Sequence, residues 1–454
     1  MPDEHFLYMI LPHPTEARIL ALAHDSGWTL PQLQPEGDLD DVFDFFRFGM
    51  KTESVLGCTV RALYCPYVDQ ANDAHGHRFV FVLETRDPAF QPPGNERWIG
   101  SDEINDLAPE YLRPTLETYF RERATGVYPP ERAPWAFPGW LDAAHGWIKE
   151  QAAANGWTLD GEIEVVRKWC ITAVLRAPTS AGNLYFKAVP PTFARETAIT
   201  RLLIRHCPTH IPTLVASQDA SHWLLMRDFG GTLLGESKDV ADWERALHDF
   251  AALQVTMSGQ IEALFQCDAM DYRLEVLPEK LDVLLADEEI LKPNHQITAE
   301  EIERARQLAP RIKALIAELQ GYRLPATVVH SDFHPWNTAV NEDRIIFFDW
   351  TEAAVGHPFS DLAQLSLIAP RIFPDQPETI AHLREAYLEG WTSFAPLETL
   401  RKALLLGEAL GVLQKAITYR HLLRCLEPNE RWSLDNTGGA VKDLLTKVEA
   451  LQEV

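Results

Sequence analysis

A chain of 454 residues, 46% of them hydrophobic and 24% charged, is long enough for two or three domains and has the composition of a folded globular protein. Its 66 acidic and 41 basic residues leave a net charge of -25, which argues against loose binding to nucleic acid or to an anionic membrane surface. A cationic ligand would be attracted, but solubility alone explains this charge equally well.

The six cysteines are scattered and form no Cys-x-x-Cys pair, so reduced thiols in a cytoplasmic protein are expected rather than disulfides. No apolar run reaches 18 residues, and the first residues lack a basic segment followed by a long apolar one. Neither a membrane span nor a signal peptide is therefore expected.

Residues 1–145 are expected to form a mixed α/β unit. Short β-like runs predict its strands at 6–11, 18–23, 59–64 and 78–84. The stretch 128–140 that follows is rich in proline, which fits no helix interior, so a linker is predicted there. Its prolines are Pro129, Pro130, Pro134 and Pro138.

The next part, residues 146–231, alternates helices with strands. After a helix over 138–155, β-like segments at 162–168, 171–177 and 184–189 predict antiparallel hairpins. A helix follows, with one apolar face formed by Phe193, Ile199, Leu202 and Leu203. Two more strands, near 213–217 and 222–228, would complete a small lobe that can grasp a nucleotide.

Residues 232–454 are expected to be mostly α-helical. Helical periodicity covers 240–257, 272–286, 299–319 and a set from residue 361 to the end. A compact β-like insert, ATVVHSDFHPWNTAVNEDRIIFFDW, interrupts the helices. The polar loops of this insert hold the candidate chemistry.

The insert contains the pattern His-x-Asp-x-x-x-x-Asn, with His330, Asp332 and Asn337 in these positions. Asp349 follows the apolar strand 344–348. Phosphoryl transfer needs a base at the acceptor hydroxyl and hard oxygen ligands for Mg²⁺. Asp332 fits the base, and Asn337 and Asp349 fit the magnesium ligands.

Two plainer explanations stay open for this insert. It can be an ordinary hairpin with a surface aspartate and a turn-forming His-Pro pair. Alternatively, His330 and His334 could share a zinc ion, although histidines four apart do so when they lie on a helix, and here they flank Pro335 in a loop. His330 is more easily understood as a loop anchor.

Upstream, Lys187 lies in the strand LYFKAV, and Glu196 lies in the helix after it. Such a lysine and glutamate can form an ion pair that holds the α- and β-phosphates, although a lone lysine beside a strand is usually only solvated. The segment LLMRDFGG would then connect two lobes, with backbone groups of Arg227 and Phe229 available to adenine. A buried strand closed by a Gly-Gly turn also fits that segment.

From about residue 160 to 450 the sequence resembles the aminoglycoside phosphotransferase family, on the motifs HSDFHPWN, IIFFDW and GHPFSDLAQL. The resemblance implies an α+β, protein-kinase-like bilobal fold with a β-rich N-lobe (146–231) and a helical C-lobe (232–454). It also implies a Mg²⁺-dependent transfer of the γ-phosphate of ATP or GTP to a hydroxyl of a small molecule, which would be aminoglycoside-like, a sugar or another metabolite.

By this resemblance Asp332 is the catalytic base, while His330 and Asp361 support the catalytic loop. Asn337 and Asp349 would bind Mg²⁺. The implied nucleotide-binding residues are Lys187, Glu196, Met226, Arg227 and Phe229. The family's substrates contact acidic and aromatic groups, and the candidates here, each of which can equally be a core or surface residue, are Glu352, Trp391, Tyr419, Glu427, Glu430 and Trp432.

Two features depart from the family pattern. No Gly-x-Gly-x-x-Gly covers the phosphates, so Thr172 and backbone amides near Ile171 would have to serve, and a pseudokinase or nucleotide-binding regulator is the alternative function. Residues 1–145 form an extension that resembles a Nudix domain around Gly27–Pro31. Its expected catalytic helix, 37–57, lacks the Arg-Glu pair and the glutamate ladder, so a Nudix-like domain without hydrolase activity is predicted.

Overall fold

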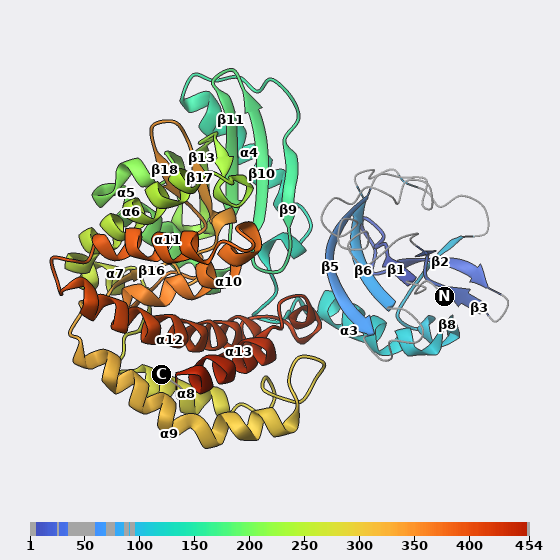
Figure 1. Ribbon diagram of the computed structural model, residues 1–454. Coiled ribbons are helices and arrows are strands. Elements are labelled where there is room, and N and C mark those ends of the chain that lie inside the picture. The colour runs from blue at the N-terminus through green and yellow to red at the C-terminus, as the bar shows by residue number, and fades with distance from the viewer. Residues whose placement is uncertain are drawn as a thin grey trace. The chain divides into compact units, whose positions relative to one another are not determined.

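The structure is a computed structural model, and it describes residues 6–24, 27–34, 60–69, 78–85, 90 and 96–451. The chain forms two compact units (Figure 1). Unit 1 comprises Met1–Pro190 and Leu426–Trp432, and unit 2 comprises Pro191–Cys425 and Ser433–Val454. The three domains expected from the sequence, at 1–145, 146–231 and 232–454, stay a prediction.

Unit 1 begins with two four-stranded sheets. One has the order β4-β1-β6-β5 and the other β7-β2-β3-β8. In the first sheet β1 is parallel to β6, and the other pairs are antiparallel. The strands are β1 (Phe6–Ile10), β2 (Ile19–His24), β3 (Gly27–Thr29), β4 (Gln32–Leu33), β5 (Val60–Asp69), β6 (Arg78–Thr85), β7 (Arg97–Ile99) and β8 (Leu107–Ala108).

Alternate side chains of β1 enter two different apolar clusters. Leu7 and Met9 belong to one cluster, and Tyr8 and Ile10 belong to the other, which helix α3 (Arg113–Thr125) also lines. Successive side chains of a strand point to opposite faces, so both faces of this sheet are buried. The predicted Nudix likeness stays a prediction, because its catalytic helix was expected at 37–57, outside the described residues.

A buried arginine fastens the proline-rich stretch of unit 1. Arg132 Nε lies 2.5 Å from Glu427 Oε1, and its Nη1 lies 3.1 Å from Glu122 Oε2. Its guanidinium also lies over the ring of Tyr64, 3.9 Å from the ring centre. Only 4% of the Arg132 side chain is exposed, so the stretch expected to be a linker is instead packed against its surroundings.

Replacing Arg132 with methionine is expected to destabilise unit 1 by about 3–5 kcal/mol, because it leaves two carboxylates buried without their cation. Urea unfolding, combined with hydrogen exchange in α3, measures this loss. Arg113→Met is the control: it breaks the exposed pair of Arg113 with Glu110, and such a pair contributes little. Equal losses in the two variants would contradict the prediction.

Unit 1 also contains the antiparallel strands β9 (Glu164–Lys168), β10 (Ala173–Thr179) and β11 (Gly182–Ala188), which follow helix α4 (Trp140–Ala154). They agree with the predicted segments to within two residues. Buried and partly buried side chains alternate along β10, as a half-buried strand requires. Lys187 lies on β11 and is only 7% exposed.

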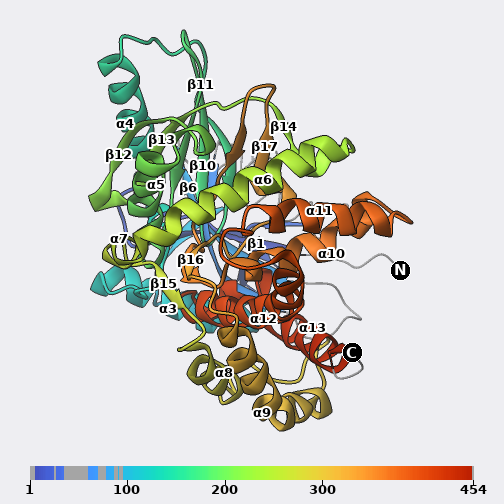
Figure 2. The same cartoon turned by 60° about the vertical axis from the view of Figure 1, so that its left-hand side comes forward.

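Unit 2 is mainly helical, as expected for its part of the sequence. Its helices are α5 (Arg195–His206), α6 (Val240–Met257), α7 (Ile261–Gln266), α8 (Leu277–Leu285), α9 (Ala299–Gly321), α10 (Leu362–Ile372), α11 (Pro377–Glu389), α12 (Leu397–Arg424) and α13 (Thr437–Ala450). Figure 2 shows α6 beside α11, with which it packs, and Figure 1 shows α12 beside α13.

The predicted helix 272–286 is shorter in the structure. Tyr272 ends a strand, β15 (Met270–Tyr272), and the helix α8 begins only at Leu277. Pro278 stands in its first turn, where a proline is tolerated because its missing N–H has no helical partner. A proline farther inside a helix would have removed a hydrogen bond, and this accounts for the later start.

Short strands of unit 2 form two three-stranded sheets, ordered β14-β17-β18 and β15-β19-β16. These two sheets hold the β-like insert. Strands β12 and β13 pair antiparallel and belong to a five-stranded sheet of the order β12-β13-β11-β10-β9. The bounds are β12 (Leu214–Gln218), β13 (Trp223–Arg227), β14 (Thr232–Leu233), β16 (Thr327–Val329), β17 (Thr338–Val340), β18 (Ile345–Phe347) and β19 (Ala354–Gly356).

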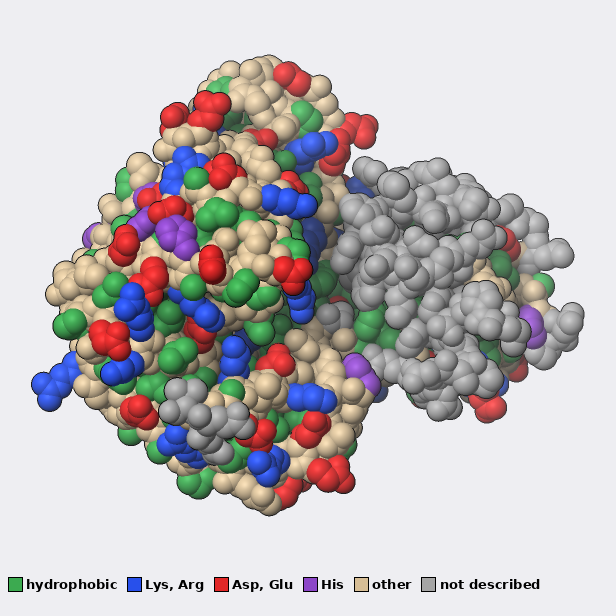
Figure 3. Space-filling view, in the orientation of Figure 1, with side chains coloured by type: hydrophobic (Ala, Val, Ile, Leu, Met, Phe, Trp, Pro, Cys, Tyr) green, Lys and Arg blue, Asp and Glu red, His purple; other side chains and the backbone are tan. Residues whose placement is uncertain are grey.

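On the face that Figure 3 shows, acidic and basic side chains are interspersed over the helices of unit 2. On this face the acidic charges therefore lie among cations. Within the described parts of the chain, no helix combines the length and the apolar character needed to cross a bilayer.

Candidate active site

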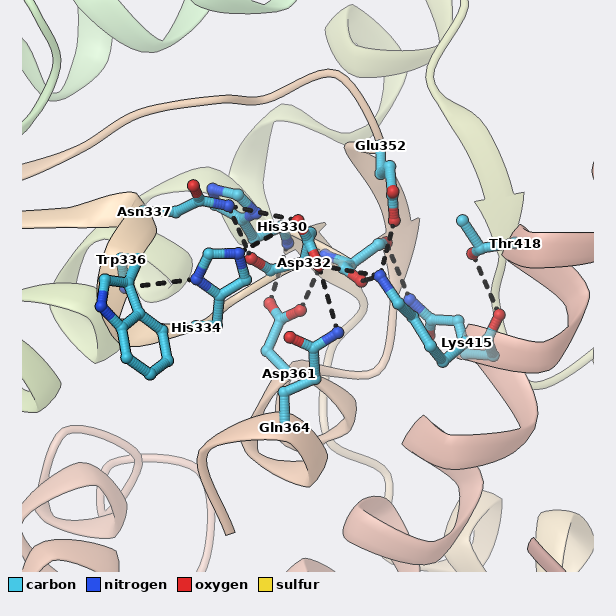
Figure 4. Close-up of polar contacts among 12 residues, drawn as sticks. His330, Asp332, His334, Trp336, Asn337, Glu352, Asp361, Gln364, Lys415 and Thr418 are labelled. Carbon is cyan, nitrogen blue, oxygen red and sulfur yellow. Dashed lines mark hydrogen bonds and ion pairs between the residues drawn. The ribbon is translucent and has the colours of Figure 1, made fainter. Parts of the chain in front are cut away.

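The candidate site lies in the loop between β16 and β17 (Figure 4). Two residues in its backbone, Ser331 and Asp349, have left-handed conformations with φ of 64° and 65°. Non-glycine residues adopt this conformation at a cost, and such residues gather at functional sites. The two turns lie where β16 ends and where β18 ends, so both strands deliver polar side chains to one place.

Donors surround the carboxylate of Asp332. Its Oδ1 lies 2.8 Å from Lys415 Nζ and accepts a hydrogen bond of 3.2 Å from Gln364 Nε2. Its Oδ2 accepts a 3.2 Å bond from Asn337 Nδ2 and lies 3.4 Å from His334 Nε2. Helices α10 and α12 and the loop itself therefore fix the orientation of this carboxylate (Figure 4).

These contacts set the charge of Asp332. Burial raises the pKa of its carboxyl, but the Lys415 ammonium and the hydrogen bond from His334 outweigh burial and hold the pKa well below its usual range. Lys415 also lies 3.0 Å from Glu352 Oε2. Burial raises the pKa of Glu352 to about 7 in spite of this contact.

Close helix packing brings Lys415 to the loop. Gly407, Gly411 and Lys415 follow at intervals of four residues, so they share one face of α12. A Cβ atom at Gly407 would collide with Phe359, and one at Gly411 would collide with the carbonyl oxygen of Ser360. The two glycines let α12 approach the segment before α10 closely, and the next residue on that face is Lys415.

The carboxylate of Asp361 braces the loop from below. It accepts 2.9 Å hydrogen bonds from the backbone N–H groups of His330 and Ser331. A third bond, 3.0 Å long, comes from Gln254 Nε2 on α6, and Tyr387 donates in turn to Gln254 Oε1. Burial raises the pKa of Asp361 to about 7, even though the two N–H groups oppose this.

The two histidines of the motif are both held within the loop. His330 Nε2 lies 2.9 Å from the carbonyl oxygen of Phe348, and burial lowers the pKa of His330 to about 4, so the ring is neutral and donates this bond. His334 Nδ1 accepts from the N–H of Trp336, which leaves the Nε2 proton for Asp332. No group of three or more His, Cys, Asp or Glu side chains in the described part of the chain is placed to hold a metal.

Asn337 and Asp349 are neighbours across a hairpin. The N–H of Phe348 donates to the carbonyl oxygen of Asn337, so Asp349 follows directly after the residue paired with Asn337. Thr351 Oγ1 lies 2.7 Å from Asp349 Oδ1 and 3.0 Å from Glu196 Oε2. The Asn337 amide donates through its nitrogen to Asp332, which leaves its oxygen as a ligand. An amide and a carboxylate oxygen form a donor set that fits Mg²⁺.

Two predicted nucleotide ligands, Lys187 and Thr172, lie in unit 1. The hydroxyl of Thr172 is buried and donates to the carbonyl oxygen of Ala188, so this side chain fastens the sheet. The predicted pairing of Lys187 with Glu196, which lies on α5 of unit 2, stays a prediction.

Met226, one of the residues expected beside adenine, is partly buried near the end of β13. The N–H of Arg227 donates to Thr213, and the carbonyl oxygen of Phe229 accepts from Asn341. One backbone group of each residue is thus paired within the protein, and the predicted contact of this segment with adenine stays a prediction.

The predicted substrate residues have different surroundings. Glu352 and Tyr419 both contact Lys415, whose Nζ lies 5.0 Å from the centre of the Tyr419 ring. Trp391 has no exposed surface and packs in the core of unit 2. Its predicted substrate contact was wrong, because a side chain that is fully enclosed cannot reach a solute.

The remaining three substrate candidates lie in the segment of unit 1 that follows α12. Glu427 binds Arg132. Trp432 packs on Phe79, with ring centres 5.7 Å apart. Glu430 is half-buried, and desolvation together with the Glu427 charge raises its pKa to about 8. All three residues thus have contacts within unit 1, and their predicted substrate role stays a prediction.

A cavity of about 370 Å³ adjoins the loop in unit 2. Gln364 and Arg371 of α10, Lys415 and Tyr419 of α12, and Asp443 of α13 are among the residues that line it. The two side chains that bind Asp332 Oδ1 therefore also face this cavity. Its volume suits a molecule the size of a sugar or an amino alcohol.

Sequence reasoning missed three residues of this site: Lys415, Gln364 and Gln254. Each is a single polar residue on a long helix, where solvent exposure is the usual explanation. Gly407 and Gly411 lie on the same face of α12 as Lys415. This pair of glycines is a sequence signal that could have indicated close packing of that face against another segment.

Comparisons with known proteins agree with the motif. A model of the phosphotransferase enzyme family matches residues 170–397, half of the chain. No curated protein matches the sequence.

Solved structures give more distant likenesses. A choline/ethanolamine kinase family protein from Mesorhizobium loti is 18% identical, with a TM-score of 0.48 over 69% of this chain and 95% of that one. An ethanolamine kinase from Plasmodium vivax is 11% identical, with a TM-score of 0.49 over 75% and 93%. A macrolide 2'-phosphotransferase type I is 15% identical, with a TM-score of 0.44 over 66% and 97%.

The assignment rests on the family model, which spans Lys187, the loop between β16 and β17, and the segment after it as far as Asp361. The predicted family, and with it a protein-kinase-like fold of mixed helix and sheet, is confirmed. The chain belongs to the phosphotransferase enzyme family.

Proposed function

We propose that this protein is a kinase that moves the γ-phosphate of ATP or GTP to a hydroxyl of a small molecule. The observation that carries the proposal is the carboxylate of Asp332, which is ionised, fixed by donors on two helices and a loop, and adjacent to a cavity. A surface aspartate on an ordinary hairpin would need none of these supports.

In the proposed step Asp332 orients the acceptor hydroxyl and takes its proton. The acceptor oxygen forms a bond to the γ-phosphorus, the bond from that phosphorus to the bridging oxygen breaks, and the electron pair leaves with the nucleoside diphosphate. The transition state of phosphoryl transfer is loose, so a base of low pKa is adequate, since positioning contributes more than proton affinity.

Asn337 and Asp349 would hold a divalent cation, which supplies charge neutralisation to the phosphates when bound. His330 and Asp361 keep the loop in place through its backbone. Lys187 and Glu196 would orient the α- and β-phosphates. Lys415 keeps the base ionised through its own charge and thus supports the chemistry from the acceptor side.

The proposal is tested by measuring phosphate transfer from ATP and from GTP, with Mg²⁺, to a panel of acceptors. The panel contains aminoglycosides, a macrolide, choline, ethanolamine and simple sugars. Transfer to any acceptor that is lost in Asp332→Asn supports the kinase. A protein that binds nucleotide without any turnover would instead support the regulatory alternative.

The pH profile is expected to depend on Glu352. Since burial raises its pKa from 4.5 to about 7, Glu352 is mostly neutral at pH 6 and mostly charged at pH 8. In the charged form it shares the Lys415 ammonium with Asp332, so Asp332 becomes more basic. Transfer should therefore rise modestly, on the order of twofold, between pH 6 and 8, because a more basic carboxylate takes the acceptor proton more readily.

Glu352→Gln removes this titration, so its kcat/KM should stay flat across the same pH range. Glu385→Gln is the matched control, because Glu385 also binds a cation, Arg401, at 2.8 Å but does not contact Asp332. A slope near pH 7 that persists in Glu352→Gln would assign the titration to another group.

A further inference from the structure

The carboxylate of Asp332 has no free position for an acceptor in this structure. Each carboxylate oxygen accepts two hydrogen bonds through its lone pairs. Oδ1 faces Lys415 and Gln364, and Oδ2 faces Asn337 and His334. An acceptor hydroxyl can therefore donate to Oδ1 only when Lys415 or Gln364 leaves.

Three of the four donors are held by further contacts. Lys415 is bound to Glu352 as well, at 3.0 Å. Asn337 also donates to the backbone carbonyl oxygen of Asp332, at 3.1 Å. The ring of His334 is fixed by the N–H of Trp336.

Gln364 differs from Lys415 in its charge and from Asn337 and His334 in its position. Its amide is neutral, so its bond to the carboxylate lacks the charge that holds Lys415. It also lines the cavity beside the loop, as Lys415 does, whereas Asn337 and His334 do not line that cavity. Figure 4 shows its amide approaching Asp332 from α10. Gln364 is thus the donor that a molecule in the cavity can replace with the least loss.

We propose that the Gln364 amide occupies the position of the acceptor hydroxyl on Asp332 Oδ1 until an acceptor enters the cavity and displaces it. This inference rests on the proposed kinase function. Gln364 then has a second effect, because the same amide keeps water away from Asp332 Oδ1. Gln364 therefore suppresses hydrolysis of the nucleotide when no acceptor is bound.

The suppressed reaction is the transfer of the γ-phosphate to water. A water oxygen would bond to the γ-phosphorus, the bond to the bridging oxygen would break, and Asp332 would take one proton from the water. The products are inorganic phosphate and the nucleoside diphosphate. This water needs the same position on Oδ1 that the acceptor hydroxyl uses, and Gln364 fills it.

The test is the release of phosphate from Mg²⁺-ATP and Mg²⁺-GTP without any acceptor. Gln364→Ala is expected to raise this rate roughly tenfold, since a hydrogen bond to a charged group no longer competes with water. Gln364→Met keeps the volume of the side chain and should behave in the same way. Gln364→Met therefore still tests the proposal if Gln364→Ala fails to fold.

The control is Gln320→Ala. Gln320 on α9 also donates an amide hydrogen bond to a carboxylate, that of Glu275 at 3.3 Å, but it has no contact with the loop. The hydrolysis rate of Gln320→Ala should therefore stay at the wild-type value.

In the double variant Gln364→Ala/Asp332→Asn the excess hydrolysis should disappear.

Two failures can be told apart. If Asp332-dependent turnover exists but neither Gln364 variant raises hydrolysis, the displacement model is wrong and the kinase proposal stands. If no variant shows turnover that depends on Asp332, both proposals are wrong. Excess hydrolysis that survives in the double variant would also overturn the displacement model, because water would then react without this base.

Discussion

Replacing Asp332 with alanine is expected to lower phosphate transfer about 10²- to 10⁴-fold, the contribution typical of a positioned general base. The change removes the group that orients the acceptor. It leaves Asn337 and Asp349, the proposed ligands on the phosphate side, in place. The affinity for nucleotide, measured by calorimetry, should therefore stay within a few-fold of the wild-type value.

Two further variants separate the chemistry from the fold. Asp332→Asn keeps the shape of the side chain, but its amide cannot take a proton, so it should be nearly as inactive as the alanine variant. Asp343→Ala removes an exposed carboxylate near the turn of the same hairpin and should leave transfer unchanged. Full activity in Asp332→Ala would exclude this residue as the base.

The parts of the site that could be predicted are those that local sequence determines. His330, Asp332 and Asn337 lie within eight consecutive residues, and the strand after them delivers Asp349. Apolar strands on both sides of a polar loop form a hairpin by local pattern alone. Asp361 was accessible only through the family resemblance, and the structure gives its physical reason, since it accepts two backbone N–H groups of the loop.

The parts that could not be predicted depend on helix packing. Lys415 and Gln364 reach Asp332 because α10 and α12 pack against the loop, and no local pattern encodes that approach. The burial of Trp391 has the same origin, because an aromatic residue on a helix can face the core or a ligand equally well. The start of α8 could have been predicted from Pro278.

Short strands were also missed, because three residues give no usable periodicity. Strands β15 and β19, each of three residues, pair with each other, and β19 also pairs with β16. Their sheet carries the start of the loop, since β16 leads directly into His330. Non-local pairing of this kind decides where the loop begins, and it becomes visible only in the folded chain.

The second large effect is expected at Asp349. Asp349→Ala removes one of the two proposed oxygen ligands for Mg²⁺, so both transfer and its dependence on Mg²⁺ should be lost. Removing a metal ligand typically weakens metal binding much more than it weakens contacts with the base or sugar of a nucleotide. A readout independent of activity is the binding of Mn²⁺ in the presence of a nucleotide analogue, measured by electron paramagnetic resonance, which should weaken at least tenfold by the same reasoning.

Backbone strain must be separated from the loss of a ligand, because Asp349 has a left-handed backbone with φ of 65°. An alanine there costs about 1 kcal/mol or more. Asp375 is the matched control: it is exposed and has φ of 59°, so Asp375→Ala adds similar strain without touching the site. In Asp349→Asn, the asparagine tolerates the left-handed backbone and keeps an oxygen ligand, but that oxygen lacks the negative charge of the carboxylate. The Mn²⁺ affinity of this variant should therefore be intermediate. If Asp349→Ala binds Mn²⁺ as the wild type does, Asp349 is not a metal ligand, and its bond with Thr351 is then its role in the loop.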